Sequence, residues 1–262
     1  PARPDGGPVL PLTKASGAWS PMAVLKEMSE TPKPEFDAFA GDYNRSLRES
    51  LRASGETPDY FADYKARYLA RRISVGPGSR ILDFGCGVGN LVAALRRQVP
   101  GVRVDGYDPS PASLEQIPAD VKGSGRFSSD LADLEDGYDA GVMAGVLHHI
   151  QPEKRAGVIA KATSRLRPGG SLVAFEHNPL NPLTRRVVDA CPFDKDAVLL
   201  PAGETVGLMT GTGLISVQRD YIVFFPSAFR ALRPLEPALG WCPLGAQYAV
   251  TGTRGEKSKA SR

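Results

Sequence analysis

The chain has 262 residues, 42% of them hydrophobic, which is enough for one sizeable buried core. Its formal net charge is only +3, and much of the excess basic charge lies in residues 254–262, which argues against the dense basic surface of a strong nucleic-acid binder. No apolar run approaches the ~20 residues that cross a bilayer and no signal peptide is recognisable, so we expect a cytoplasmic protein without a membrane span.

The part of the chain before the predicted sheet divides into an arm and a helical cap. Residues 1–34 are rich in Pro and Gly and lack periodicity, so we predict an irregular arm with a short helix around residues 22–28. Residues 35–75 are predicted to form a cap of two helices, because aromatic and apolar residues recur there at spacings of three and four. The first helix carries Phe36, Phe39, Tyr43 and Leu47; the second begins at Pro58, after the N-cap Thr57, and carries Tyr60, Tyr64, Tyr68 and Leu69.

From Ser79 onward, short apolar segments alternate with helical patterns. The expected strands cover residues 80–84, 102–107, 125–128, 138–143 and 171–176, with a turn over 167–170, and the expected helices cover 90–98, 111–117 and 152–166. Such alternation indicates an α/β fold with a doubly wound parallel sheet. Right-handed crossovers bring the carboxyl ends of the strands to one edge, where ligands of this fold class bind.

The last part of the chain departs from this alternation. We predict a helix over residues 202–212, strands over 214–225 and 246–253, and a proline-rich connection over 226–243. Two strands joined in this way suggest an antiparallel pair at one edge of the sheet. We therefore expect the core to cover residues 76–253 and residues 254–262 to form a basic disordered tail.

The most informative pattern is a glycine-rich turn between the first strand and the first helix. The sequence R-I-L-D-F-G-C-G-V-G-N covers residues 80–90 and places Asp83 at the strand end, before Gly85, Gly87 and Gly89. Glycines allow the backbone to approach a ligand closely, and a helix start offers free N–H groups. A dinucleotide fingerprint has the spacing G-x-G-x-x-G. The spacing here is G-x-G-x-G, which disfavours a nicotinamide dehydrogenase.

A second acidic residue, Asp108, ends the second predicted strand and precedes Pro109. An acid about 20 residues past such a glycine turn can accept hydrogen bonds from both hydroxyls of a ribose. The alternative is that Asp108 only caps the following helix, as Asp often does before Pro. We favour the ribose-binding interpretation because the glycine turn precedes it.

These patterns in combination resemble the class I S-adenosylmethionine (SAM)-dependent methyltransferases of the small-molecule methyltransferase-domain type. The resemblance covers roughly residues 36–253. It implies a Rossmann-like seven-stranded sheet with an antiparallel last strand, an N-terminal helical lid, SAM as cofactor and S-adenosylhomocysteine as product. The cofactor-binding residues that it implies are Tyr43, Asp83, Gly85, Cys86, Gly87, Asp108, Pro109, Asp130, Leu131 and Ala144.

Within this resemblance, Asp130 would bind the adenine amino group and Leu131 would pack on the ring. A carboxylate that accepts from an exocyclic amine is sensible chemistry. The alternative is an acid of a surface loop, because further acids follow at Asp133, Glu135 and Asp136. Tyr43 would lie near the methionine part of the cofactor, although tyrosines at helical spacing more often pack in a core.

Polar residues at the ends of the fourth and fifth strands are the candidates for the acceptor side. His148, His149, Glu176 and His177 are the catalytic candidates, because a neutral imidazole can take a proton near pH 7. For His149 we favour a packing role. Tyr64, Lys65 and Asn178 are weaker candidates for substrate binding, and Asn181 is predicted to be the N-cap of a helix that begins at Pro182.

The implied reaction is an in-line transfer of a methyl group to an O, N or C atom of a small molecule. It needs no metal, and we expect no metal site, because Cys86, Cys191 and Cys242 lie far apart without C-x-x-C spacing and no other ligand cluster is evident. The motif N-P-P-[FY] of amino-methylating nucleic-acid enzymes is absent after the fourth strand, which lowers the expectation of a nucleic-acid partner. The alternative is a SAM-binding protein of the same fold without methyl transfer, either regulatory or with other sulfonium chemistry.

Overall fold

The computed structural model of the chain describes residue 37 and residues 40–123 and 125–256. They belong to the compact unit Pro34–Arg262, which is described by itself. The predicted arm, the predicted helix around residues 22–28, Phe36, Phe39 and the last residues of the predicted tail lie outside the described residues.

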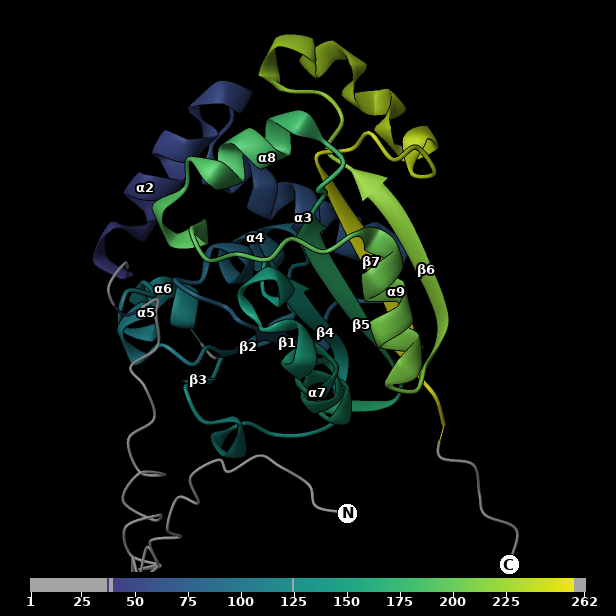
Figure 1. Cartoon of the computed structure of the whole chain (residues 1–262). Helices are drawn as coiled ribbons and strands as arrows, with labels where there is room; N and C mark the ends of the chain where they lie inside the picture. Colours follow the sequence, from purple (N-terminus) through teal and green to yellow (C-terminus); the bar gives the residue numbers. More distant parts are fainter. Residues whose placement is uncertain (1–36, 38–39, 124, 257–262) are drawn as a thin grey trace, which may run out of the picture. The chain divides into compact units, whose positions relative to one another are not determined.

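Within the described residues, seven strands form one mixed sheet in the order β3-β2-β1-β4-β5-β7-β6 (Figure 1). The strands are β1 (Arg80–Phe84), β2 (Arg103–Tyr107), β3 (Phe127–Ser128), β4 (Tyr138–Ala144), β5 (Leu166–His177), β6 (Leu214–Ile222) and β7 (Gln247–Arg254). The pairs from β3 through β5 are parallel, whereas β7 runs antiparallel to both β5 and β6. This confirms the predicted α/β fold and its antiparallel last strand. The order reverses between β1 and β4, which is where ligands bind in such sheets.

Helices cover both faces of the sheet (Figure 1). They are η2 (Ala40–Asp42), α2 (Tyr43–Ser50), η3 (Leu51–Ser54), α3 (Pro58–Arg72), α4 (Asn90–Gln98), α5 (Pro111–Glu115), α6 (Ala119–Lys122), η4 (Leu131–Asp133), η5 (Leu147–His149), α7 (Pro152–Ser164), α8 (Pro182–Asp189), η6 (Pro192–Asp194), α9 (Ala202–Gly211) and η7 (Ser227–Leu239).

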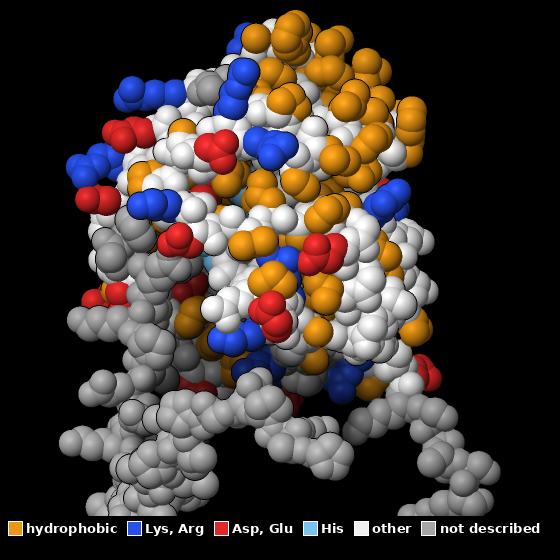
Figure 2. All heavy atoms as spheres, in the orientation of Figure 1, with side chains coloured by type: hydrophobic (Ala, Val, Ile, Leu, Met, Phe, Trp, Pro, Cys, Tyr) orange, Lys and Arg blue, Asp and Glu red, His pale blue; other side chains and the backbone are white. Residues whose placement is uncertain are grey.

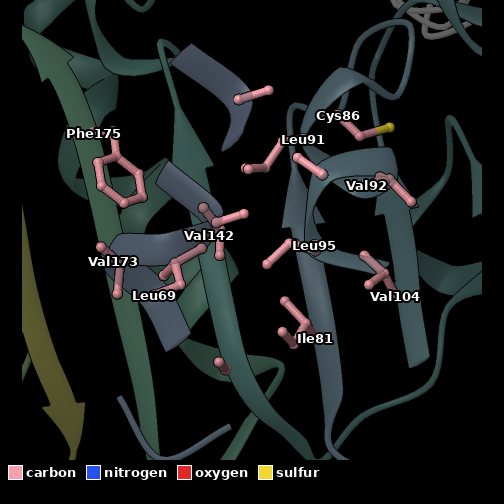
Figure 3. Close-up of a cluster of buried hydrophobic side chains, with 14 of the residues drawn as sticks. Leu69, Ile81, Cys86, Leu91, Val92, Leu95, Val104, Val142, Val173 and Phe175 are labelled. Carbon is pink, nitrogen blue, oxygen red and sulfur yellow. The ribbon is translucent and has the colours of Figure 1, made fainter. Parts of the chain in front are cut away.

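Neighbouring residues of a central strand point to opposite faces, so each strand contributes to two cores. Ile81 lies in the core under α3 and α4, together with Leu69 and Leu95 (Figure 3). Leu82, the next residue, lies in the core under α7 and α9, together with Ile159. Burial on both faces fixes the register of β1, and the residues that follow its carboxyl end are fixed with it.

The structure differs from the sequence-based expectations mainly at element ends. The predicted turn over residues 167–170 is part of β5, because Leu166 already pairs with Tyr138 across an irregularity in the ladder. The strand predicted to reach residue 225 ends at Ile222, and the next residue, Val223, leaves the extended conformation with a φ of 60°. The proline-rich connection contains the 3₁₀ segment η7.

Asn181 is the N-cap of α8, as predicted. Its side-chain oxygen accepts hydrogen bonds from the backbone N–H groups of Leu183 and Thr184, each at 3.0 Å. We expect Asn181→Ala to lower the free energy of unfolding by about 1 kcal/mol, measured by urea denaturation. Gln98→Ala, at an exposed position of α4, is the control. Equal midpoints for the two variants would show that the cap contributes nothing.

Exposed hydrophobic side chains gather at the end of the sheet where η7 lies. Figure 2 shows them over the upper right of the molecule, and they include Phe229, Leu232, Leu235, Trp241 and Leu244. This segment connects the end of β6 to the start of β7, beside the carboxyl end of β5. Among the described residues, no helix combines the length and apolarity that a membrane crossing requires.

Candidate functional site

A cavity of about 260 Å³ lies at the carboxyl ends of the parallel strands and is also lined by residues of α2 and α3. It brings together most of the predicted site residues from six separate parts of the chain. Those that line it are Tyr43, Lys65, Asp83, Gly85, Cys86, Gly87, Asp108, Pro109, Ala144, His148, His149, Glu176 and His177. Tyr64, Asp130, Leu131 and Asn178 are not among its lining residues.

The glycine turn after β1 is held in a conformation that other residues would not adopt. Gly85 has a φ of +87°, and a Cβ there would lie 2.5 Å from a methyl group of Val146. The N–H groups of Gly85 and Cys86 both donate to the Tyr107 carbonyl, at 2.7 and 3.0 Å. At Gly87, with a φ of +50°, a Cβ would meet nothing within 4 Å. The turn is therefore anchored to β2 on one side and leaves open space on the other.

Asp108 links this turn to the loop after β2. Its two carboxylate oxygens accept from the N–H of Gly87 at 2.7 Å and from the N–H of Ser110 at 2.9 Å. The N-cap of α5 is Ser110 and not Asp108, so the capping alternative does not explain this residue. Burial raises the pKa of the Asp108 carboxyl, although both N–H groups oppose this. Because a carboxylate can accept about four hydrogen bonds, it retains acceptor capacity at the cavity wall.

Asp83 is a buried acid without a partner. Its side chain is 1% exposed, and neither carboxylate oxygen has a hydrogen-bond partner among the described residues. Burial and the nearby Asp108 raise its pKa to about 7, although Lys65 lowers it. A buried polar group without a partner destabilises the fold by roughly 1–3 kcal/mol. A cationic donor in the cavity would remove that cost, and the ammonium group of the methionine part of SAM is such a donor.

The cap contributes an aromatic and a cationic residue to the cavity. The ring of Tyr43 stacks on that of Phe193, with centroids 4.9 Å apart. Burial lowers the pKa of Lys65 to about 8, although Glu176 and Asp83 act in the opposite direction. Its ammonium lies 5.9 Å from the centroid of the Phe61 ring. The cap thus covers the same cavity that the strand ends form.

The opposite wall is a cluster of histidines and carboxylates. His148 Nδ1 lies 2.5 Å from Glu176 Oε2, and Glu176 Oε1 accepts from the N–H groups of Val146 and Leu147 at 3.0 and 2.7 Å. Burial lowers the pKa of His148, but Glu176 and Asp194 outweigh it and raise the pKa to about 9. Without ligands, His148 is therefore a cation at pH 7. Burial and this cation lower the pKa of His177 to about 4, so His177 is neutral.

The structure adds residues to this wall that the sequence did not indicate. Asp194 of η6 is 8% exposed, and its Oδ1 lies 3.5 Å from His148 Nε2 and 3.3 Å from His149 Nε2. Nearby, Arg155 is 1% exposed and holds η5 in place: its Nε donates to the carbonyls of Leu147 and Ile150 at 3.0 and 3.1 Å. The sequence did not indicate a cluster of metal-ligand types, but η6 brings a carboxylate to the two histidines.

The four predicted residues outside the cavity have partners elsewhere. Asn178 donates to the carbonyls of Pro243 and Gly245 at 3.0 and 2.7 Å and is 1% exposed, so its side chain holds a loop. Tyr64 accepts from the N–H of Val223 at 3.4 Å. Asp130 is exposed and caps η4 by accepting from Ala132 N–H at 2.8 Å. Leu131 packs against the core under α7 and α9.

The chain was compared with known proteins. A family model described as a methyltransferase domain matches residues 82–172. The chain is 32% identical over 121 residues to the carboxy-S-adenosyl-L-methionine synthase of Aeromonas hydrophila, covering 41% of this chain and 49% of that protein. It is also 32% identical over 164 residues to the methyltransferase GfsG of Streptomyces halstedii, covering 52% of this chain and 58% of that protein.

Among solved structures, magnesium protoporphyrin IX methyltransferase from Synechocystis, crystallised with bound S-adenosylhomocysteine, superposes on 89% of this chain and 100% of its own, with a TM-score of 0.59 and 17% identity. The chain spans about half the length of the curated relatives it matches. The sheet order, the glycine turn and the two acids agree with the family match. Residues 82–172 therefore match a methyltransferase domain, and the fold that contains them is the one found in SAM-dependent methyltransferases of known structure.

Proposed function

We propose that the protein transfers the methyl group of SAM to an O, N or C atom of a small molecule. The observation that carries the proposal is Asp83, a buried acid without a partner at the wall of a cavity that also contains the glycine turn and Asp108. An acid in that position stabilises neither the sheet nor the turn, and a ligand with an ammonium group accounts for it. When bound, SAM supplies an activated methyl group, and the C–S electron pair stays on sulfur as the acceptor's lone pair forms the new bond.

The residues of the chain have distinct roles in this proposal. Asp108 binds the ribose hydroxyls and Asp83 binds the ammonium group. The turn that contains Gly87 leaves room for the cofactor. Tyr43 and the rest of the cap exclude water from the reacting atoms. Where the acceptor loses a proton, we propose that the cluster around His149 and Asp194 assists the loss of that proton to solvent. Asp130 and Leu131 contact the adenine ring in this proposal.

The proposed acceptor is a small molecule. Support comes from the cavity, which lies between the strand ends and the cap, and from the weak net charge of the chain. We propose that the protein works in a reducing cytoplasm, and the free state of Cys86, Cys191 and Cys242 supports this. The alternative, a SAM-binding protein with other sulfonium chemistry, is favoured by the similarity to a carboxy-S-adenosyl-L-methionine synthase. An acceptor screen with methyl-labelled SAM separates the two functions, since only methyl transfer moves the label to the acceptor.

Calorimetry with SAM and with a nicotinamide dinucleotide tests the cofactor assignment. We expect binding of SAM alone, and Asp108→Ala should weaken it by about 10–100-fold, because a hydrogen bond to a charged group contributes about 1.5–3 kcal/mol. Asp120→Ala, at an exposed position of α6, is the control and should bind SAM normally. Unchanged affinity of the Asp108 variant would refute its ribose role. Failure of the wild-type protein to bind SAM at millimolar concentration would refute the proposed function.

A further inference from the structure

The histidine–carboxylate wall of the cavity has the composition and spacing of an open metal site. His148, His149 and Asp194 each offer one ligand atom, and these atoms all lie within 4.8 Å of one another. Ligands bonded to one metal ion at about 2.1 Å, with angles of 90° to 109°, lie about 3.0–3.4 Å apart. The distances to Asp194 Oδ1 are 3.3 Å from His149 Nε2 and 3.5 Å from His148 Nε2, close to that range.

The surroundings of His148 orient it as metal-binding histidines are oriented. Its Nδ1 contacts Glu176 Oε2 at 2.5 Å, which directs Nε2 toward Asp194. Metal-binding histidines commonly pair their second nitrogen with a carboxylate in this way, which fixes the tautomer and the ring. Glu176 is itself fixed by the N–H groups of Val146 and Leu147. The first ligand is therefore preorganised by a second layer of hydrogen bonds.

We propose that His148, His149 and Asp194 bind a divalent first-row transition-metal ion such as Zn²⁺, Fe²⁺ or Co²⁺. Two imidazoles and one carboxylate suit these ions, whereas Mg²⁺ and Ca²⁺ prefer oxygen ligands. Three protein ligands leave positions open on the ion, and all three residues line the cavity. The open positions therefore face the space that holds small molecules.

The metal narrows the class of acceptor, and this step rests on the proposed methyltransferase function. A metal ion binds an ionised oxygen better than a neutral hydroxyl, so the expected acceptor carries an ionisable hydroxyl, alone or beside a second oxygen donor. The hydroxyl proton passes to solvent when the oxygen binds. The oxygen keeps a lone pair for the new bond to the methyl group, while the C–S electron pair remains on sulfur.

Metal titration of the ligand-free protein tests the site independently of SAM and acceptor. The protein should be free of any affinity tag, because the chain itself has only three histidines and a tag would add more. Calorimetry with Zn²⁺ should show one ion per chain at micromolar affinity or tighter. Asp194→Asn and His149→Asn should each weaken binding at least tenfold. The matched control is Asp196→Asn, an exposed acid in the same segment, which should bind Zn²⁺ like the wild type.

Co²⁺ absorption provides a second readout, and the wild-type protein alone already shows which kinds of atom bind the ion. We expect a visible spectrum of nitrogen and oxygen ligation, without the intense near-ultraviolet band of a thiolate ligand, and Cys191→Ser should leave it unchanged. Equal Zn²⁺ affinity in wild type, Asp194→Asn and His149→Asn, or a thiolate band lost in Cys191→Ser, would overturn the metal site. If the protein binds SAM in the presence of a chelator and does not bind Zn²⁺ in the titration, the metal site is refuted and the proposed function is not. If the protein binds Zn²⁺ but not SAM, the proposed function is refuted and the metal site is not.

Discussion

Replacing Asp83 by Asn is expected to stabilise the ligand-free protein at neutral pH and to weaken its binding of SAM. The carboxylate is 1% exposed and has no hydrogen-bond partner among the described residues, so the wild-type fold buries a charge that Lys65 only partly offsets whenever this group ionises. An amide of the same shape carries no charge to bury. The ammonium of SAM loses its counter-charge, however, and we expect SAM affinity to fall at least about tenfold.

The raised pKa of Asp83 determines how the stability of the wild-type protein changes with pH. The pKa of Asp83 is about 7 in the fold, through burial and the nearby Asp108, with Lys65 opposing, against about 3.9 in an unfolded chain. Between about pH 4 and 7 the folded chain holds a proton that the unfolded chain has lost, so the free energy of unfolding falls as pH rises. It levels off above the pKa that Asp83 has in the folded protein. About 3 pKa units correspond to a fall of about 4 kcal/mol.

Urea unfolding of ligand-free wild type and Asp83→Asn at pH 5 and pH 8 measures this effect. Asp108 and Cys86 face the same carboxyl and have raised pKa values of their own, so the informative quantity is the difference between the two proteins. The variant should lose most of the fall between the two pH values. Asp120→Asn, at an exposed position, should keep it. An identical fall in wild type and Asp83→Asn would show that Asp83 does not titrate in this range.

Replacing Arg155 by Met is expected to lower the free energy of unfolding by about 3–5 kcal/mol, because a buried charged group loses several hydrogen bonds at once, each contributing about 1.5–3 kcal/mol. The guanidinium donates to Glu204 Oε1 at 2.7 Å, to the Val198 carbonyl at 2.6 Å, and through Nε to the carbonyls of Leu147 and Ile150. Methionine keeps the length of the stem and offers no donor, so these acceptors lose their partner.

Urea unfolding measures this loss of stability. Urea unfolding should show the large decrease for Arg155→Met and an intermediate one for Arg155→Lys, which keeps the charge without the planar fork. Arg185→Met, at an exposed position of α8, is the control and should lie within about 0.5 kcal/mol of wild type. A loss for Arg155→Met no larger than that of the control would rule out Arg155 as the anchor of η5.

The sequence predicted the glycine-turn side of the cavity better than the wall that contains Asp194, for a physical reason. Asp83, Gly85 and Gly87 lie within one short turn, where the spacing itself determines the geometry, and Asp108 follows at the end of the adjacent strand. Asp194 differs because its position depends on how the segment between β5 and α9 packs over the strand ends. The sequence spacing of His149 and Asp194 does not predict the 3.3 Å contact between His149 Nε2 and Asp194 Oδ1.

The sequence also did not predict the roles of two buried polar side chains. Arg155 lies in the run Pro-Glu-Lys-Arg at the start of a helix, a pattern typical of a solvated face, yet it is 1% exposed. Asn178 was expected at the cavity because it ends a strand, whereas its amide is used to hold the loop at residues 243–245. In both positions, carbonyl groups from distant segments decide what the side chain does.

The three histidines of the chain all lie on the wall of one cavity. Imidazole ring protons give resolved signals in a proton NMR spectrum, apart from the crowded aliphatic region. In this protein every imidazole signal comes from the site, with two carbon-bound protons per ring and no background from histidines elsewhere. The unlabelled protein therefore contains its own reporter, and each cofactor, metal or acceptor added to it can be followed ring by ring.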